Sequence, residues 1–195
     1  MYLGKDYKPK NSNEDFGWHS RKLPHLDSNV HTQFVTFRLS DSMPQELIDQ
    51  WREESRSDAT FRKKVEAYLD AGFGNCWLRM PKIAEIVASA IKHFDGKRYK
   101  LHAWIVMPNH VHILFTQYEN EHLPEIMHSI KSYTAQMANR SLGLKGQFWQ
   151  HESFDRYIRD GRHFKAVVKY IEMNPVKARL CELPEECRFG SAFVE

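Results

Sequence analysis

Hydrophobic residues recur along the chain with two periods, one typical of strands and one typical of helices. The strand-like segments are 30–39, 99–107, 110–117 and 148–158. The helix-like segments, with apolar residues three and four positions apart, are 44–70, 81–94, 123–142 and 162–173. This order predicts the α+β class: a ferredoxin-like antiparallel sheet of four to five strands, with helices on one face and a helix at the C-terminal end.

The domain organisation follows from length and composition. With 195 residues, 42% of them hydrophobic, the chain can bury one sizeable core. We expect a single domain over residues 30–180 that contains a helical insertion at about 40–80. Residues 1–29 have few clustered hydrophobic residues and are expected to form a flexible arm, while residues 181–195 form an acidic C-terminal tail.

Two histidines interrupt the most apolar strand pattern, at 110–117. Side chains alternate along a strand, so His110 and His112 project from the same face and Val111 from the other. Two imidazoles in this arrangement can bind one metal ion. The alternative is a pair of hydrogen-bonded histidines on a half-buried strand, which the motif alone does not exclude.

A second pattern lies in the last helix-like segment. Tyr170 and Asn174 are four residues apart, which places a phenol and an amide oxygen on one helical face. The histidine strand and this helix together predict a site of His110, His112, Asn174 and Tyr170. The alternative is structural: Tyr170 is an ordinary residue of an amphipathic helix, and Asn174 ends that helix before Pro175.

Other residues could take these places. His151 or His163 would replace Asn174 as the third ligand if the helix were rotated differently. Tyr157 is the next candidate nucleophile.

The chain resembles the single-tyrosine HUH transposases, and within them the REP-associated tyrosine transposases. The segments that carry the resemblance are His31–Leu39, Phe94–Gly96, Ala103–His112, Phe148–Gln150, Phe154–Asp160 and Asn174–Ala178. The chain departs from the family in a longer segment between Leu39 and Lys97, and in an Asn rather than a Gln at the amide position.

The resemblance implies a single HUH domain that cleaves and rejoins single-stranded DNA. Tyr170 would form a 5′-phosphotyrosine, and His110, His112 and Asn174 would bind a divalent metal. Imidazole and amide ligands without a thiolate suit Mg²⁺ or Mn²⁺ and would also accept zinc or nickel. The implied partners are single-stranded DNA and DNA hairpins of the REP type, with a homodimer possible. The rival functions are a non-catalytic hairpin-binding regulator and an HUH replication initiator or relaxase.

Basic and aromatic residues near these motifs are candidate DNA contacts. Lys and Arg outnumber Asp and Glu between residues 98 and 179, although the formal net charge is only +3. The candidates for phosphate contacts, and one for base stacking, are Arg156, Arg159, Lys131, Arg140, Lys169, Lys177 and Trp149.

The cysteines and the hydropathy bear on the compartment. Cys76, Cys181 and Cys187 are odd in number and lack the spacing of a zinc or redox motif, so we expect free thiols in a reducing compartment. No apolar run reaches the length needed to span a bilayer, and the first residues do not form a signal sequence. These features predict a cytoplasmic location with no membrane partner, and the family resemblance implies a bacterial protein near the nucleoid.

Overall fold

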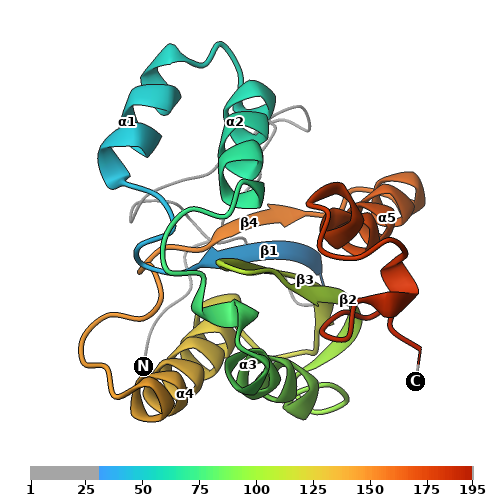
Figure 1. Cartoon of the computed structure of the whole chain (residues 1–195). Helices are drawn as coiled ribbons and strands as arrows, with labels where there is room; N and C mark the ends of the chain where they lie inside the picture. The colour runs from blue at the N-terminus through green and yellow to red at the C-terminus, as the bar shows by residue number, and fades with distance from the viewer. Residues whose placement is uncertain (1–30, 195) are drawn as a thin grey trace, which may run out of the picture.

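The computed structural model describes residues 31–194, in which four strands form one antiparallel sheet in the order β2-β3-β1-β4 (Figure 1). The strands are β1 (Thr32–Arg38), β2 (Tyr99–Val106), β3 (His110–Gln117) and β4 (Phe154–Tyr157). This confirms the predicted ferredoxin-like α+β class. The expected flexible arm at 1–29 lies outside the described residues.

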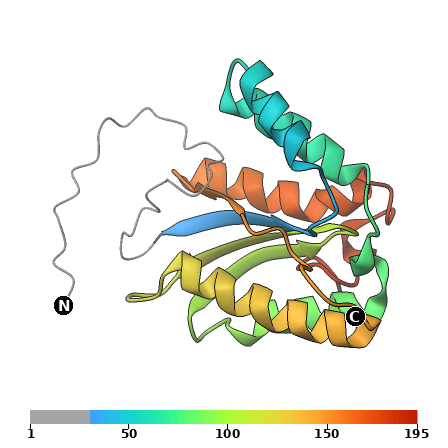
Figure 2. The ribbon, with the colours of Figure 1, turned by 90° about the vertical axis from the view of Figure 1, so that its left-hand side faces the viewer.

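Helices cover both faces of the sheet (Figure 2). They are α1 (Gln45–Glu54), α2 (Asp58–Asp70), η1 (Trp77–Arg79), α3 (Pro81–His93), α4 (Leu123–Leu142), α5 (Gly161–Lys177) and η2 (Pro184–Glu186). The two helices α3 and α4 pack side by side on one face, as expected for this fold. The C-terminal helix α5 packs on the opposite face, and α1 and α2 lie on that same side, above β4 (Figure 1). None of the helices described is long and apolar enough to cross a membrane.

Alternation along β1 divides the interior into separate cores. Val35 and Phe37 point into the main core, which α3 and α4 complete. Phe34 points to the other side, where Val167 and Ile171 of α5 cover it. A smaller apolar cluster joins α1 and α2 to Phe154 of β4. The face of the sheet that carries Phe34 is therefore covered by two separate sets of helices, α5 and the α1–α2 pair.

Two predicted elements differ in extent. The predicted helix at 44–70 is two helices, because Ser55 takes an extended conformation and Ser57 caps α2 by accepting a hydrogen bond from the Thr60 amide. The predicted strand at 148–158 is shorter, since only Phe154–Tyr157 pairs with β1 as a strand.

The predicted end of the last helix at residue 173, before Pro175, is wrong. Helix α5 continues through Pro175 to Lys177, and the Ala178 amide donates to the Asn174 carbonyl. A proline inside a helix removes one hydrogen bond, and packing compensates here because Pro175 is buried. Asn174 is thus an interior residue of α5 and not its end.

The C-terminal segment docks on the outer edge of β2. The Val106 amide donates to the Phe189 carbonyl, and the Ser191 amide donates to the Trp104 carbonyl. Gly190 lies against Ile105 so closely that an added Cβ would come within 2.7 Å of its side chain. This contact covers backbone groups of an edge strand that would otherwise be exposed.

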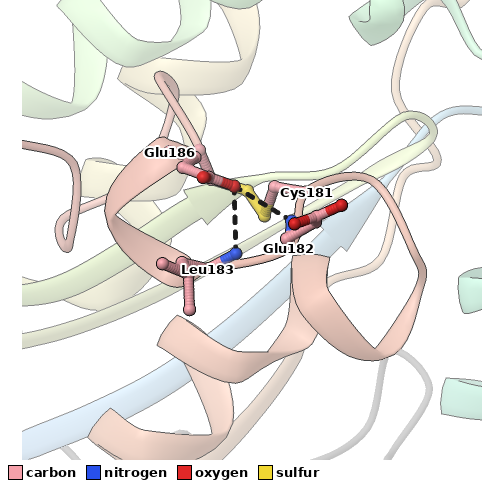
Figure 3. Close-up of a disulfide and its surroundings, with 5 residues drawn as sticks. Cys181, Glu182, Leu183 and Glu186 are labelled. Carbon is pink, nitrogen blue, oxygen red and sulfur yellow. Dashed lines mark hydrogen bonds between the residues drawn. A yellow bond between two sulfur atoms is a disulfide. The ribbon is translucent and has the colours of Figure 1, made fainter.

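Two cysteines close this segment into a loop (Figure 3). Cys181 and Cys187 form a disulfide, six residues apart in sequence, so the expectation of free thiols is wrong for this pair. The Glu186 carboxylate accepts hydrogen bonds from the Glu182 and Leu183 amides within the loop, which brings the two sulfur atoms together. Cys76 is a free, buried thiol.

We expect the disulfide to stabilise the C-terminal segment. Replacing Cys181 and Cys187 together by Ser should lower the free energy of unfolding by about 2 kcal/mol, because a small closed loop restricts the unfolded chain. Urea denaturation without reductant measures this. Reductant should bring the wild type to the value of the variant and leave the variant unchanged; a wild type that does not respond to reductant contradicts the assignment.

Candidate active site

The two histidines of β3 point toward each other on the face covered by α5. Nε2 of His110 lies 3.1 Å from Nε2 of His112, and each side chain is only 1% exposed. Burial lowers the pKa of His110 to about 3 and the pKa of His112 well below its usual value, so both rings are neutral at pH 7. Neutral imidazoles are the form that binds metals.

Hydrogen bonds fix the ring orientations. The Asn109 amide nitrogen donates to the Phe73 carbonyl, so the Asn109 amide oxygen, 2.8 Å from Nδ1 of His110, accepts a hydrogen bond from the N–H of that ring. The proton on Nδ1 leaves the lone pair of His110 on Nε2. Nδ1 of His112 lies 2.7 Å from the Thr36 hydroxyl, a partner on the adjacent strand β1. Such outer partners are typical of metal-binding histidines.

Tyr170 lies on α5 directly beside this pair. Its ring packs edge-on against His112 at 5.4 Å and against Phe34 at 5.9 Å between centroids. The hydroxyl is buried and has no hydrogen bond of good geometry within residues 31–194. Burial raises the pKa of Tyr170 well above its usual value, and Glu66 and Asp70 raise it further, while Arg156 lowers it.

Asn174 joins the same site from one turn further along α5. Its side chain is 0% exposed, and neither its amide oxygen nor its amide nitrogen has a hydrogen-bond partner of good geometry in the described part of the chain. The amide lies close enough to Asp70 and Tyr170 to lower the pKa of both. An unsatisfied buried amide is costly and rare, so Asn174 is a candidate for contact with a ligand.

Two carboxylates that the sequence analysis missed complete the site. Glu66 and Asp70 are one turn apart on α2, within the segment interpreted as an insertion. Oδ1 of Asp70 lies 3.7 Å from Nε2 of His110. Burial and Glu66 raise the pKa of Asp70 to about 6, and burial raises the pKa of Glu66. Their signal in the sequence was acidic residues at four-residue spacing beside the buried Val65 and Leu69.

The candidate DNA contacts divide between the two faces. Arg156 lies in the site, with its guanidinium 4.8 Å from the centre of the Phe34 ring, and Nζ of Lys177 lies 5.2 Å from the centre of the Tyr170 ring. Arg159 and Lys169 are exposed, one just before α5 and one on it. These four residues lie on or beside the elements that bear the site.

The remaining candidates lie on the other side of the sheet. Trp149 is 4% exposed, packs on Phe37 and donates to the Thr134 hydroxyl, so the expectation that it stacks on bases is corrected to a core role. Nζ of Lys131 donates to the Gln150 and His151 carbonyls and to the Ser153 hydroxyl. Burial lowers the pKa of Lys131 to about 8, and the residue tethers the chain before β4. Arg140 is exposed on α4.

The alternative residues are not in the site. Tyr157 pairs with Gln33, which places it on the α3–α4 face, opposite Tyr170. His163 is in the first turn of α5, 11 residues before Asn174, or about 16 Å along the helix. His151 is exposed in the connection between α4 and β4.

The geometry suits two neighbouring metal ligands. Ligand atoms about 2.1 Å from a metal and at right angles to each other are about 3 Å apart, close to the 3.1 Å between the two Nε2 atoms. Within residues 31–194, no group of three His, Cys, Asp or Glu side chains is placed to hold a metal as it stands. Further ligands must therefore come from an amide or from a small movement of a nearby side chain.

Comparison with known proteins gives the family. Residues 79–174 match the family model described as Transposase IS200 like. Over these residues, the chain belongs to the IS200-like transposase family. The REP-associated tyrosine transposase of Escherichia coli (strain K12) is 30% identical over 90 residues, which are 45% of this chain and 50% of that protein. The chain thus spans about half the length of this relative.

A solved structure supports the same fold. The structure of a REP-associated tyrosine transposase bound to a REP hairpin aligns with a TM-score of 0.53 and 21% identity, over 83% of this chain and 76% of that chain. The family match at 79–174 includes the histidines of β3 and both Tyr170 and Asn174. The α2 carboxylates lie outside it.

Lys131 should contribute to stability rather than to DNA binding. Lys131→Ala should lower the free energy of unfolding by about 2 kcal/mol, because three acceptors lose their donor. The exposed Arg140→Ala on the same helix is the control and should stay within about 0.5 kcal/mol of wild type. Thermal melts compare the two. An unchanged melt with lost hairpin affinity in Lys131→Ala would restore the DNA-contact role.

Proposed function

We propose that this IS200-like transposase is a metal-dependent endonuclease and strand transferase that acts on single-stranded DNA beside hairpins. Tyr170 attacks a phosphodiester, forms a 5′-phosphotyrosine and releases a 3′ hydroxyl, which can reverse the step. The observation that carries the proposal is the direct contact of Tyr170 with His112, whose Nε2 faces that of His110.

The donor atoms of the site fit a divalent cation such as Mg²⁺ or Mn²⁺. His110 and His112 offer two neutral nitrogen ligands, and the buried Asn174 amide oxygen lacks a hydrogen-bond donor within the described chain. The ion, when bound, would polarise the phosphate and stabilise the charge that develops on it. Thr36 and Asn109 hold the rings in the required orientation.

Nearby charged side chains control the protonation state of the Tyr170 hydroxyl. The Tyr170 phenol loses its proton when it bonds to phosphorus, and the nearby Glu66 and Asp70 oppose the phenolate. Arg156 favours the phenolate and is also placed to pair with a phosphate oxygen. The oxygen of Tyr170 therefore becomes reactive when positive charge accumulates beside it.

Hairpin DNA is the substrate that the names of the relatives point to. One relative is named for REP elements, and the aligned solved structure contains a REP hairpin. Arg159, Lys169 and Lys177 provide positive charge beside α5, where a flanking single strand would pass the nucleophile. The competing function, hairpin binding without cleavage, is favoured by the buried Tyr170 hydroxyl.

Tyr170→Phe should abolish covalent attachment of DNA and leave hairpin affinity within about twofold of wild type, because only one oxygen is removed. A denaturing gel of protein incubated with a labelled hairpin oligonucleotide and Mn²⁺ detects the linked strand. Tyr157→Phe, on the opposite face, is the matched control and should form the adduct normally. Absence of any adduct from wild type would instead support the non-catalytic function.

Asn174→Ala should raise the Mn²⁺ concentration needed for half-maximal cleavage by about tenfold or more, because an oxygen ligand is lost. Thermal melts without metal measure separately the cost of truncating this fully buried side chain. Asn174→Asp has the same size, keeps an oxygen and should restore much of the metal response. A metal titration that stays unshifted in Asn174→Ala would remove this residue from the ligand set.

A further inference from the structure

We propose that Asp70 of α2 supplies a carboxylate ligand to the metal held by His110 and His112. This inference rests on the proposed function. It assigns a role in the active site to a helix that lies outside the segment matched by the family model.

Geometry is the first support. Oδ1 of Asp70 lies 3.7 Å from Nε2 of His110, the same nitrogen that lies 3.1 Å from Nε2 of His112. Neighbouring ligands of an octahedral ion are about 3 Å apart, so a shift of less than 1 Å brings this oxygen to a ligand position. Asp70 is the last residue of α2, and its side chain is 27% exposed, which leaves room for this shift.

The second support is the set of unsatisfied polar atoms around the same point. Oδ1 of Asp70 is inaccessible to solvent and accepts no hydrogen bond of good geometry from any described residue. The amide oxygen of Asn174, from the opposite helix α5, is unsatisfied and buried in the same way. These two oxygens and the two facing imidazole nitrogens, brought together from three elements, match the ligand preference of a divalent cation.

Charge is the third support. Imidazoles bind metals in their neutral form and an amide carries no charge, so a divalent cation bound by His110, His112 and Asn174 alone would keep its full charge in a buried site. One carboxylate offsets half of that charge and leaves two positions of an octahedral ion open for a phosphate oxygen and water. The other α2 carboxylate, Glu66, lies beside Tyr170 and Arg156 instead.

Metal binding without DNA tests the assignment. Mn²⁺ affinity is measured by titration calorimetry, and by the electron paramagnetic resonance signal of free Mn²⁺, for wild type, Asp70→Asn, Glu66→Gln and His110→Ala. Both α2 variants remove one negative charge from the same helix face, one turn apart, so they separate ligation from a general field effect. Melting curves without metal verify that each variant is folded.

Asp70→Asn should weaken Mn²⁺ binding by about tenfold or more, and Glu66→Gln by no more than about threefold. An Asp70→Asn protein that binds like wild type, while His110→Ala does not bind, would overturn the role of Asp70 and leave the histidine site intact. Equal weakening in both α2 variants would also overturn it, because charge alone would then explain the loss. If wild type and His110→Ala bind equally, the proposed metal centre itself fails, and the inference fails with it.

Discussion

The pairing of β1 with β3 at the centre of the sheet determines on which face the histidine pair of the site lies. Its register joins Thr36 to His112 and Arg38 to His110, so all four polar side chains face away from the α3–α4 core. A slip of one residue would turn the histidines into that core and turn Val111 out of it. The apolar pattern of β1 and β3 therefore fixes the register, and the register fixes the histidine pair.

Three elements form the site on this face of the sheet, and each contributes a different kind of functional group. Strand β3 contributes neutral nitrogen atoms, α5 contributes a phenol and an amide, and α2 contributes two carboxylates. Burial penalises charged and unpaired groups alike, yet the site contains several of both. Local inconsistency of this kind is expected at functional sites, where binding of a ligand satisfies groups that folding leaves unsatisfied.

Much of this arrangement could be predicted from periodicity. The bounds of α4 (Leu123–Leu142) were predicted as observed, and alternation placed both histidines on one face. Tertiary contacts decided the rest. The helix through Pro175 is held by burial rather than by local propensity, and Trp149 is held by a hydrogen bond to α4. The approach of α2 to α5 depends on the packing of α1 and α2 against β4, which no local pattern encodes.

The balance of negative and positive charge in the site connects the roles of the metal, the nucleophile and the DNA. Glu66 and Asp70 face Arg156 and Lys177 in the free site, so the carboxylates are already offset by cations of the protein. A phosphodiester adds another negative charge, and the attacking phenolate of Tyr170 adds one more. The cation of the protein that favours the Tyr170 phenolate is Arg156, which already faces Glu66. A divalent ion on the histidine pair would supply the missing charge at the place where the phosphate and the phenolate meet.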